Sequence, residues 1–481
     1  MAAPAAAGLP TPTIDHSDVQ GTILRGYRVD FARHFILTID NAAATGQLIQ
    51  ALVSGSNGLP KVTTAQRPPT KPACFLNLSF TCPGLAAMGV SATDLLSFDG
   101  SFQLGATNLK VANNVGDVGS SAPANWVGGL NNGGQVHMLL SVWVTDSLDV
   151  LESVSAQLRA AFTGAVTELS TQDATALPDN MVHFGYRDSI AQPNIIGAPA
   201  TKQPSDDQPA VLTGEFLLGY ANESGGTYSV TPAQLSTNSS YAAFRILEQD
   251  VAGFEALLES YSTKAGMSSE MLAAKICGRW RNGNPLELAP TTQGPVLPTS
   301  ELNNFNYVTG QAPTDDTLGL KCPVGSHIRR NNPRDEAVVG TDSTHHRIVR
   351  RAMPYGPPYD PRLPDAGATR GLVGYFINAS VQNQFEFLSS QWNLVSSFVK
   401  SATGPGGSND GNAVFNISGQ DVFLGVNDPA SSSFTLPGLG KNGTANTTLT
   451  GFGRTVTTRG GVYVFFPSIS GLTYLAGLPQ A

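Results

Sequence analysis

Two kinds of periodicity alternate along this chain, and the alternation limits the folds that it can adopt. Residues 74–80 alternate apolar and polar side chains as a half-buried strand does. Residues 136–144 form an apolar run that predicts a buried strand, and residues 148–162 continue with apolar side chains at helical spacing. A sheet assembled from such units needs helices to cover its apolar face, so the sequence predicts an αβ fold.

The second half of the chain repeats this order of segments. The patterns predict further strands and helices: a strand pair over 20–40, strands over 216–220, 372–376 and 461–466, and helices over 42–53, 83–88, 248–261, 268–280 and 381–400. A polar link at 198–209 separates the halves. We found no fixed-period sequence repeat, yet two successive strand–helix–strand halves indicate duplicated αβ units, with domains over 1–200 and 201–481.

The composition of the chain excludes some classes of partner and location. The net charge is -8 and the sequence pI is about 5.4, which argues against nucleic acid as a partner. No apolar run approaches the roughly 18 residues of a membrane span. The start of the chain reads as a mature end rather than a signal peptide, and four cysteines without a CxxC pair predict free thiols.

Seven Asn-x-Ser/Thr triplets support a secreted glycoprotein. They lie at Asn77, Asn222, Asn238, Asn378, Asn416, Asn442 and Asn446.

The region from Cys322 to Gly356 is rich in residues that could bind a ligand or take part in catalysis. It holds six arginines and three of the chain's seven histidines. His327 follows a Pro-Val-Gly-Ser turn, and Arg329 follows it by two residues. An imidazole and a guanidinium so placed suit haem, which needs an axial nitrogen and a cation for its acid groups. The plainer interpretation is a solvated ion-pair network around an ordinary histidine.

A second candidate lies upstream, in the segment HFGYRDSIAQPNIIG. Asp188 stands there between Arg187 and Ser189, on a turn that Gly185 begins. A carboxylate displayed on such a turn is a candidate general base, although a turn-forming aspartate is the common alternative.

These motifs in this order resemble the dye-decolorizing peroxidases, in particular the secreted fungal type. The matching segments are VQGTIL from residue 19, GYRD from 185, SHIR from 326, RRAMPYG from 350, and QFEF with QW from 384. One departure is Ser189, where the family has a glycine after the acid. The resemblance implies an α+β fold of two ferredoxin-like modules, antiparallel sheets with packed helices, with haem b held between them.

The resemblance also implies roles for individual residues. His327 would be the iron ligand and Arg329 would pair with a haem propionate. Asp188 would be the acid-base group on the haem face opposite His327. Arg350 would be the cation beside it, with Arg351 as the less favoured alternative.

Two further roles depend on residues late in the chain. A carboxylate after the late helix would accept the second N–H of His327, with Asp410 the nearest candidate and Asp421 an alternative. Trp392 lies on the apolar stripe of its helix, which favours packing, while the resemblance makes it a possible radical site.

The expected function is a haem peroxidase that uses hydrogen peroxide to oxidise bulky aromatic donors in one-electron steps. Two other classes are weighed against it: a secreted haem carrier without turnover, and a cofactor-free protein associated with glycans or cell walls. A carrier has no need of an acid and an arginine opposite its ligand, so Asp188 and Arg350 favour the enzyme.

Overall fold

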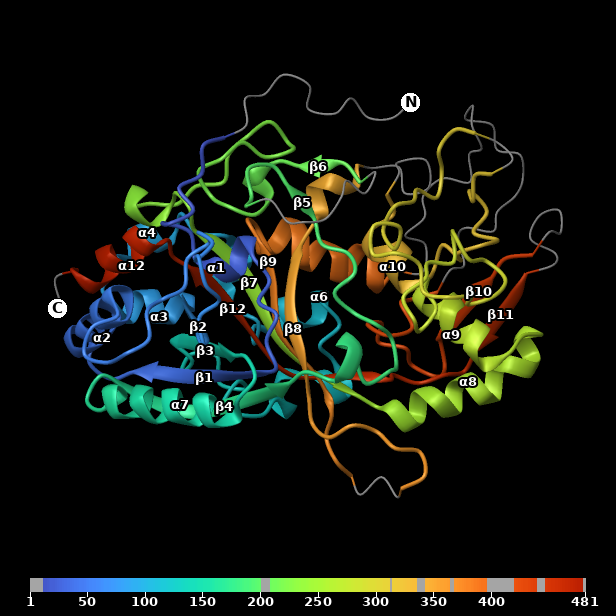
Figure 1. Cartoon of the computed structure of the whole chain (residues 1–481), viewed down its shortest axis with the longest axis horizontal. Coiled ribbons are helices and arrows are strands. Elements are labelled where there is room, and N and C mark those ends of the chain that lie inside the picture. Colours follow the sequence, from blue (N-terminus) through green and yellow to red (C-terminus); the bar gives the residue numbers. More distant parts are fainter. Residues whose placement is uncertain are drawn as a thin grey trace.

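The computed structural model describes residues 12–199, 208–311, 314–334, 342–363, 367–395, 419–438 and 446–478. Its centre is a sheet of eight strands in the order β4-β1-β3-β2-β12-β7-β9-β8 (Figure 1). The strands are β1 Phe31–Ile39, β2 Cys74–Phe80, β3 Met138–Val144, β4 Val166–Thr175, β7 Ser240–Gln249, β8 Val349–Tyr355, β9 Gly371–Asn378 and β12 Val456–Phe466.

Each half of the chain contributes four neighbouring strands to this sheet. Within each half, the spatial order of the strands is fourth, first, third, second, which is the ferredoxin-like arrangement. The two sets meet where Phe465 of β12 pairs with Phe80 of β2. The edge strands β4 and β8 contact each other, so the sheet curves into a barrel. The α+β fold of two ferredoxin-like modules is thus confirmed.

Helices cover the outside of the barrel at both ends of the molecule. In Figure 1, α2, α3 and α7 lie at one end and α8, α9 and α10 at the other. The helices are α1 Gly21–Leu24, α2 Ala42–Ser54, α3 Cys82–Ala87, α4 Ala92–Leu95, α5 Gly100–Leu104, α6 Leu109–Asn114, α7 Leu148–Phe162, α8 Val251–Ala265, α9 Ser269–Cys277, α10 His327–Asn331 and α12 Ile469–Ala476. Two π-helical segments, η7 Val381–Glu386 and η8 Leu388–Asn393, follow β9.

The core forms where the apolar stripes of helices meet the sheet. All seven residues of β3 are buried, because its outer face is covered and its inner face lines the barrel. Helix α7 starts where the Ser147 side chain accepts a hydrogen bond from the Val150 backbone N–H, and it buries Leu151, Leu158 and Phe162. Among the residues described, no helix is long and apolar enough to cross a membrane.

The inside of the barrel also holds a chain of polar groups. His34 Nδ1 lies 2.7 Å from the Ser141 hydroxyl, which lies 2.7 Å from the Tyr375 hydroxyl. The rings of Phe244 and Tyr375 both pack against His34. Burial disfavours the charged imidazolium and lowers the pKa of His34 to about 4.

Several predicted elements differ from the structure. Residues 216–220 form no strand, because this buried apolar segment continues from a 3₁₀ turn. The first member of the strand pair at 20–40 is the short helix α1. The helix predicted from residue 248 starts at Val251, because residues 240–249 form β7.

The folded state also limits the glycosylation signals. Four of the seven acceptor asparagines are buried, which leaves no room for a glycan: Asn77, Asn222, Asn238 and Asn378. Asn446 is half-buried, whereas Asn416 and Asn442 lie outside the described residues.

Candidate active site

His327 is the first residue of α10, and a carboxylate fixes its ring. Its Nδ1 lies 2.9 Å from Oδ2 of Asp421, which is completely buried. The His327 side chain is 25% exposed, and none of the described residues hydrogen-bonds its Nε2. An imidazole whose Nδ1 donates to a carboxylate presents Nε2 as a basic lone pair, which is how metal-binding histidines are oriented.

Asp421 is itself held by the backbone around it. Its Oδ1 accepts hydrogen bonds of 2.8 Å from the N–H groups of Phe423 and Leu424, and its own N–H donates to the Asn393 carbonyl. Burial alone raises the pKa of Asp421, but the neighbouring charges of His327 and Arg330 outweigh it, so the pKa is lowered. An ionised Asp421 can then accept the imidazole N–H.

Two asparagines join the helix of His327 to the π-helical segment. Asn331 donates to the His327 carbonyl at 2.8 Å and exchanges two hydrogen bonds of 3.2 Å with Asn393. Because Asn393 also accepts from the Asp421 N–H, the imidazole, its carboxylate and η8 form one hydrogen-bonded unit. Asp421 takes the place predicted for Asp410, which lies outside the described residues.

A pocket opens beside this unit, on the outer face of the second half of the sheet. Its wall includes Asn331, one turn after His327, together with Ile348, which directly precedes β8, and Phe376 from β9. Further apolar lining comes from Leu247, Phe385, Leu388, Leu424 and Val456. Polar groups lie at one end, namely Asp117, Ser121, Arg245, Arg454 and Thr458.

The two adjacent arginines of β8 point to opposite faces of the sheet. Arg350 pairs across the sheet with Phe376, which lines the pocket, whereas Arg351 pairs with Tyr375, which faces the barrel interior. Directly paired residues share a face, so Arg350 lies on the pocket side. Arg351 instead donates from Nε to the Thr22 carbonyl at 2.8 Å, and burial lowers its pKa to about 10.

Asp188 lies on a loop that is fastened to β8 beside Arg350. The Arg350 guanidinium donates to the Ala191 carbonyl, and Gln192 exchanges two hydrogen bonds of 3.1 Å with the backbone of Arg350. The Asp188 side chain is exposed. Ser189 has a φ of 62°, in the left-handed region that a glycine adopts freely.

The structure contradicts the predicted role of Arg329. Its side chain is only 1% exposed, and Nη1 donates to Oδ2 of Asp316 at 2.9 Å. The guanidinium also lies over the Tyr307 ring at 4.2 Å from its centroid. The buried ion pair with Asp316 keeps Arg329 from a propionate, because breaking such a pair would leave an uncompensated charge.

Trp392 belongs to a buried aromatic cluster rather than to the surface. It is 3% exposed, and the rings of His346 and Phe387 pack against it with centroids 5.5 and 5.4 Å away. His346 and Phe387 stack on each other at 3.6 Å. The position of Trp392 is therefore that of a packed core residue.

The pocket residues fit a haem. His327 offers one basic nitrogen, and the pocket beside its helix has largely apolar walls that suit a flat macrocycle. At the polar end, two guanidinium groups, Arg245 and Arg454, face one carboxylate, Asp117, which lies 2.5 Å from Arg245. This end therefore carries net positive charge that suits the acid groups of a haem. Sequence reasoning missed both arginines because they stand alone in segments without a motif.

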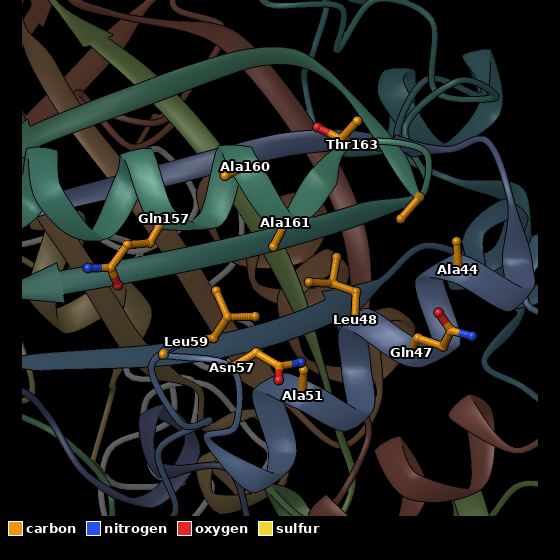
Figure 2. A pocket seen from close by; sticks show the side chains of 12 residues that line it. Ala44, Gln47, Leu48, Ala51, Asn57, Leu59, Gln157, Ala160, Ala161 and Thr163 are labelled. Carbon is orange, nitrogen blue, oxygen red and sulfur yellow. The ribbon is translucent and has the colours of Figure 1, made fainter.

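A second hollow lies far from these groups, between α2 and α7. Small and apolar side chains line it, among them Ala44, Leu48, Ala51, Leu59 and Ala161 (Figure 2). Its twelve lining residues include no acid, base or histidine, so this groove offers no catalytic group.

Comparisons with known proteins agree with this architecture. Residues 18–178 match the family described as "DyP dimeric alpha+beta barrel domain". The dye-decolorizing peroxidase msp1 of Mycetinis scorodonius is 29% identical over 97% of this chain and 89% of its own length. The dye-decolorizing peroxidase of Exidia glandulosa is also 29% identical, over 98% of this chain and 89% of its own.

Solved structures give the same result. A dye-decolorizing peroxidase in complex with 2,6-dimethoxyphenol superposes with a TM-score of 0.78 and 26% identity, over 96% of this chain and all of its own.

Fold, pocket and relatives together define a haem peroxidase, an oxidoreductase that uses hydrogen peroxide to oxidise aromatic donors. The chain is similar to the dye-decolorizing peroxidases over nearly its whole length. The curated relatives above are peroxidases, which speaks against a haem carrier and a cofactor-free wall protein.

Proposed function

We propose that His327, oriented by Asp421, would bind the iron of a haem, while Asp188 and Arg350 would act on peroxide. The observation that supports this assignment is that neighbours of both His327 and Arg350 line one pocket. Asn331, on the helix of His327, and Phe376, the cross-strand partner of Arg350, both line it.

The proton chemistry falls to the side chains. Haem, when bound, supplies the iron that exchanges electrons with peroxide. Asp188 takes the first proton from the bound peroxide and delivers it to the departing oxygen. Arg350 stabilises the negative charge that develops there, and a fixed guanidinium in a water-poor pocket contributes about 3–4 kcal/mol, as single oxyanion-hole donors do.

Asp421 would act by making Nε2 of His327 more basic. Because Asp421 accepts the Nδ1 proton of His327, the ring donates more electron density from Nε2 than a neutral imidazole would. A bound haem iron would therefore be favoured in its more oxidised states.

Replacing His327 tests the axial assignment. We expect His327→Ala to lose most of its haem, measured as the Soret absorbance per protein after purification and after incubation with added haem. Arg329→Met, on the same helix but bound to Asp316, is the control that should keep haem. Full occupancy with an unchanged spectrum in His327→Ala would place the axial ligand elsewhere.

Trp392 is proposed to carry oxidising equivalents from the pocket region to donors too large to enter it. Its neighbour Asn393 lines the pocket, and the half-buried His346 ring covers its outer side. Trp392→Phe should then slow turnover of a bulky dye while sparing a small phenol. Equal losses for both donors would leave packing as its role.

Secretion and the division of the chain are also proposals. The fungal relatives and the Asn446 triplet support an extracellular protein, which mass spectrometry for a glycan at Asn446 would test. We place the boundary between the modules near residue 200, because β4 ends at Thr175 and β7 begins at Ser240.

A further inference from the structure

Helix α10 carries a second completely buried arginine, to which the proposed peroxide chemistry assigns no part. Arg330 is 0% exposed and lies three residues after His327. Burial lowers its pKa to about 10. Burying a guanidinium costs free energy, so its contacts should serve a purpose.

The guanidinium of Arg330 reaches two separate segments of the chain. Nη1 donates to the carbonyls of Trp392 at 2.5 Å and Val395 at 3.3 Å, and Nη2 donates to the Gly419 carbonyl. Nε donates to the Gly325 carbonyl at 3.0 Å, within the turn before His327. One side chain thus ties the turn of the imidazole, the end of η8 and the start of the Asp421 segment together.

The position of one of these contacts along the chain makes the arrangement informative. Asp421 follows Gly419 by two residues. The hydrogen bond from Arg330 to the Gly419 carbonyl therefore fixes the backbone beside Asp421 against α10.

We propose that Arg330 is a positioning residue that holds Asp421 in contact with His327 by joining the end of η8 and the backbone at Gly419 to α10. It touches neither peroxide nor donor. The inference rests on the proposed axial role of His327 and adds a residue that sets the strength of that ligand.

Arg329 offers a matched control. Both arginines are buried on the same short helix, but Arg329 donates to Asp316 and to the carbonyls of Asp316 and Cys322. Removing either guanidinium should lower stability. Only the loss of Arg330 should release Asp421.

The test compares Arg330→Met, Arg329→Met, Asp421→Asn and the double variant Arg330→Met/Asp421→Asn in the haem-loaded protein. The readouts are the iron–imidazole stretching frequency of the ferrous protein and the reduction potential. Asp421→Asn should lower the frequency and raise the potential, because the imidazole loses its carboxylate. We expect Arg330→Met to shift both in the same direction, and the double variant to shift no further than Asp421→Asn alone.

Arg329→Met should show wild-type values of both. An unshifted frequency in Arg330→Met, or an equal shift in Arg329→Met, would overturn the proposal. If Arg330→Met does not fold, Arg330→Lys serves instead. A lysine ammonium should reach either the carbonyls at the end of η8 or the Gly419 carbonyl, but not both. It should give an intermediate shift, and wild-type values would overturn the proposal. Loss of haem in His327→Ala with no shift in the Arg330 variants would refute only this inference.

Discussion

The proton acceptor that we propose, Asp188, is a carboxylate rather than an imidazole, and this difference should affect the working pH range. Carboxylates ionise near pH 4 and imidazoles near pH 6.5, so a carboxylate base still functions in acid. We expect peroxide cleavage to persist at about pH 3–4. Asp188→Asn should slow it by roughly 10²–10⁴-fold without loss of haem. Stopped-flow rates between pH 3 and 7 would show this, and a wild-type rate that collapses below pH 5 would contradict it.

Ser189 adopts a backbone conformation that ordinary residues avoid. A left-handed φ costs a side-chain-bearing residue about 1–2 kcal/mol, and glycine escapes this cost but loses more entropy on folding. Ser189→Gly should therefore raise the free energy of unfolding by up to about 1 kcal/mol, whereas Ser189→Val should lower it. Thermal unfolding of both variants checks this. If Ser189→Val is as stable as the wild type, the turn carries no strain.

At the scale of elements, strand β8 separates two neighbouring arginines by face. Arg350→Leu should slow peroxide cleavage by roughly 10²–10³-fold because it removes the cation on the pocket side. Arg351→Leu should leave that rate near wild type and cost about 1–3 kcal/mol of stability, because a buried carbonyl loses its donor. Stopped-flow kinetics and thermal unfolding separate the two effects.

Gln192→Ala is the control for this comparison. It removes the two backbone hydrogen bonds that fasten the Asp188 loop to β8 but keeps both guanidinium groups. A rate for Gln192→Ala as low as that of Arg350→Leu would show that the arginine acts only by holding the loop.

The elements also show where sequence reasoning succeeds. Strand 74–80 and helix 148–162 were predicted with the bounds that the structure shows, because the sequence of each has the matching period. The strand was expected to be half-buried, but both of its faces are buried. Strand β4 was missed because it is a mostly polar edge strand, and β8 was missed because its arginines suggest a loop.

In the site, too, sequence reasoning found residues that stand in local motifs but not the partners that lie far away in the sequence. His327 stands out in its own motif, whereas its partner Asp421 is 94 residues away. Sequence spacing favoured Asp410 and left Asp421 as the alternative, because spacing alone does not show which carboxylate contacts His327 in the fold. Arg329 was misassigned because its carboxylate partner, Asp316, lies in a loop with no pattern.

At the scale of the whole molecule, the barrel interior links stability to pH. His34 has a pKa of about 4 in the folded protein and an ordinary value near 6.5 when unfolded. Between these values the unfolded chain binds more protons, so stability is lost as pH falls from about 6.5 to about 4. The loss from this group amounts to roughly 3 kcal/mol.

His34→Gln should reduce this loss while it keeps a hydrogen-bonding partner for Ser141. The measurement is the melting temperature from pH 7 to pH 4 for the two proteins. The wild type should fall more steeply than the variant, and parallel curves would show that His34 does not titrate as its burial implies. Stability should therefore fall over a pH range in which peroxide cleavage is expected to persist.

The two modules share one strand order but differ in how their helices cover the sheet, and this difference should set the number of haem groups that the protein binds. In the first half, α2 and α7 contact each other over the sheet and leave only the groove of Figure 2. Their counterparts in the second half are α8, which packs on α9 and β11, and η7, which packs on β7 and β9. One copy of the module thus has its two helices in contact, whereas in the other copy the corresponding segments pack on different elements and the pocket lies beside η7. We therefore expect one haem per chain, bound by the second module.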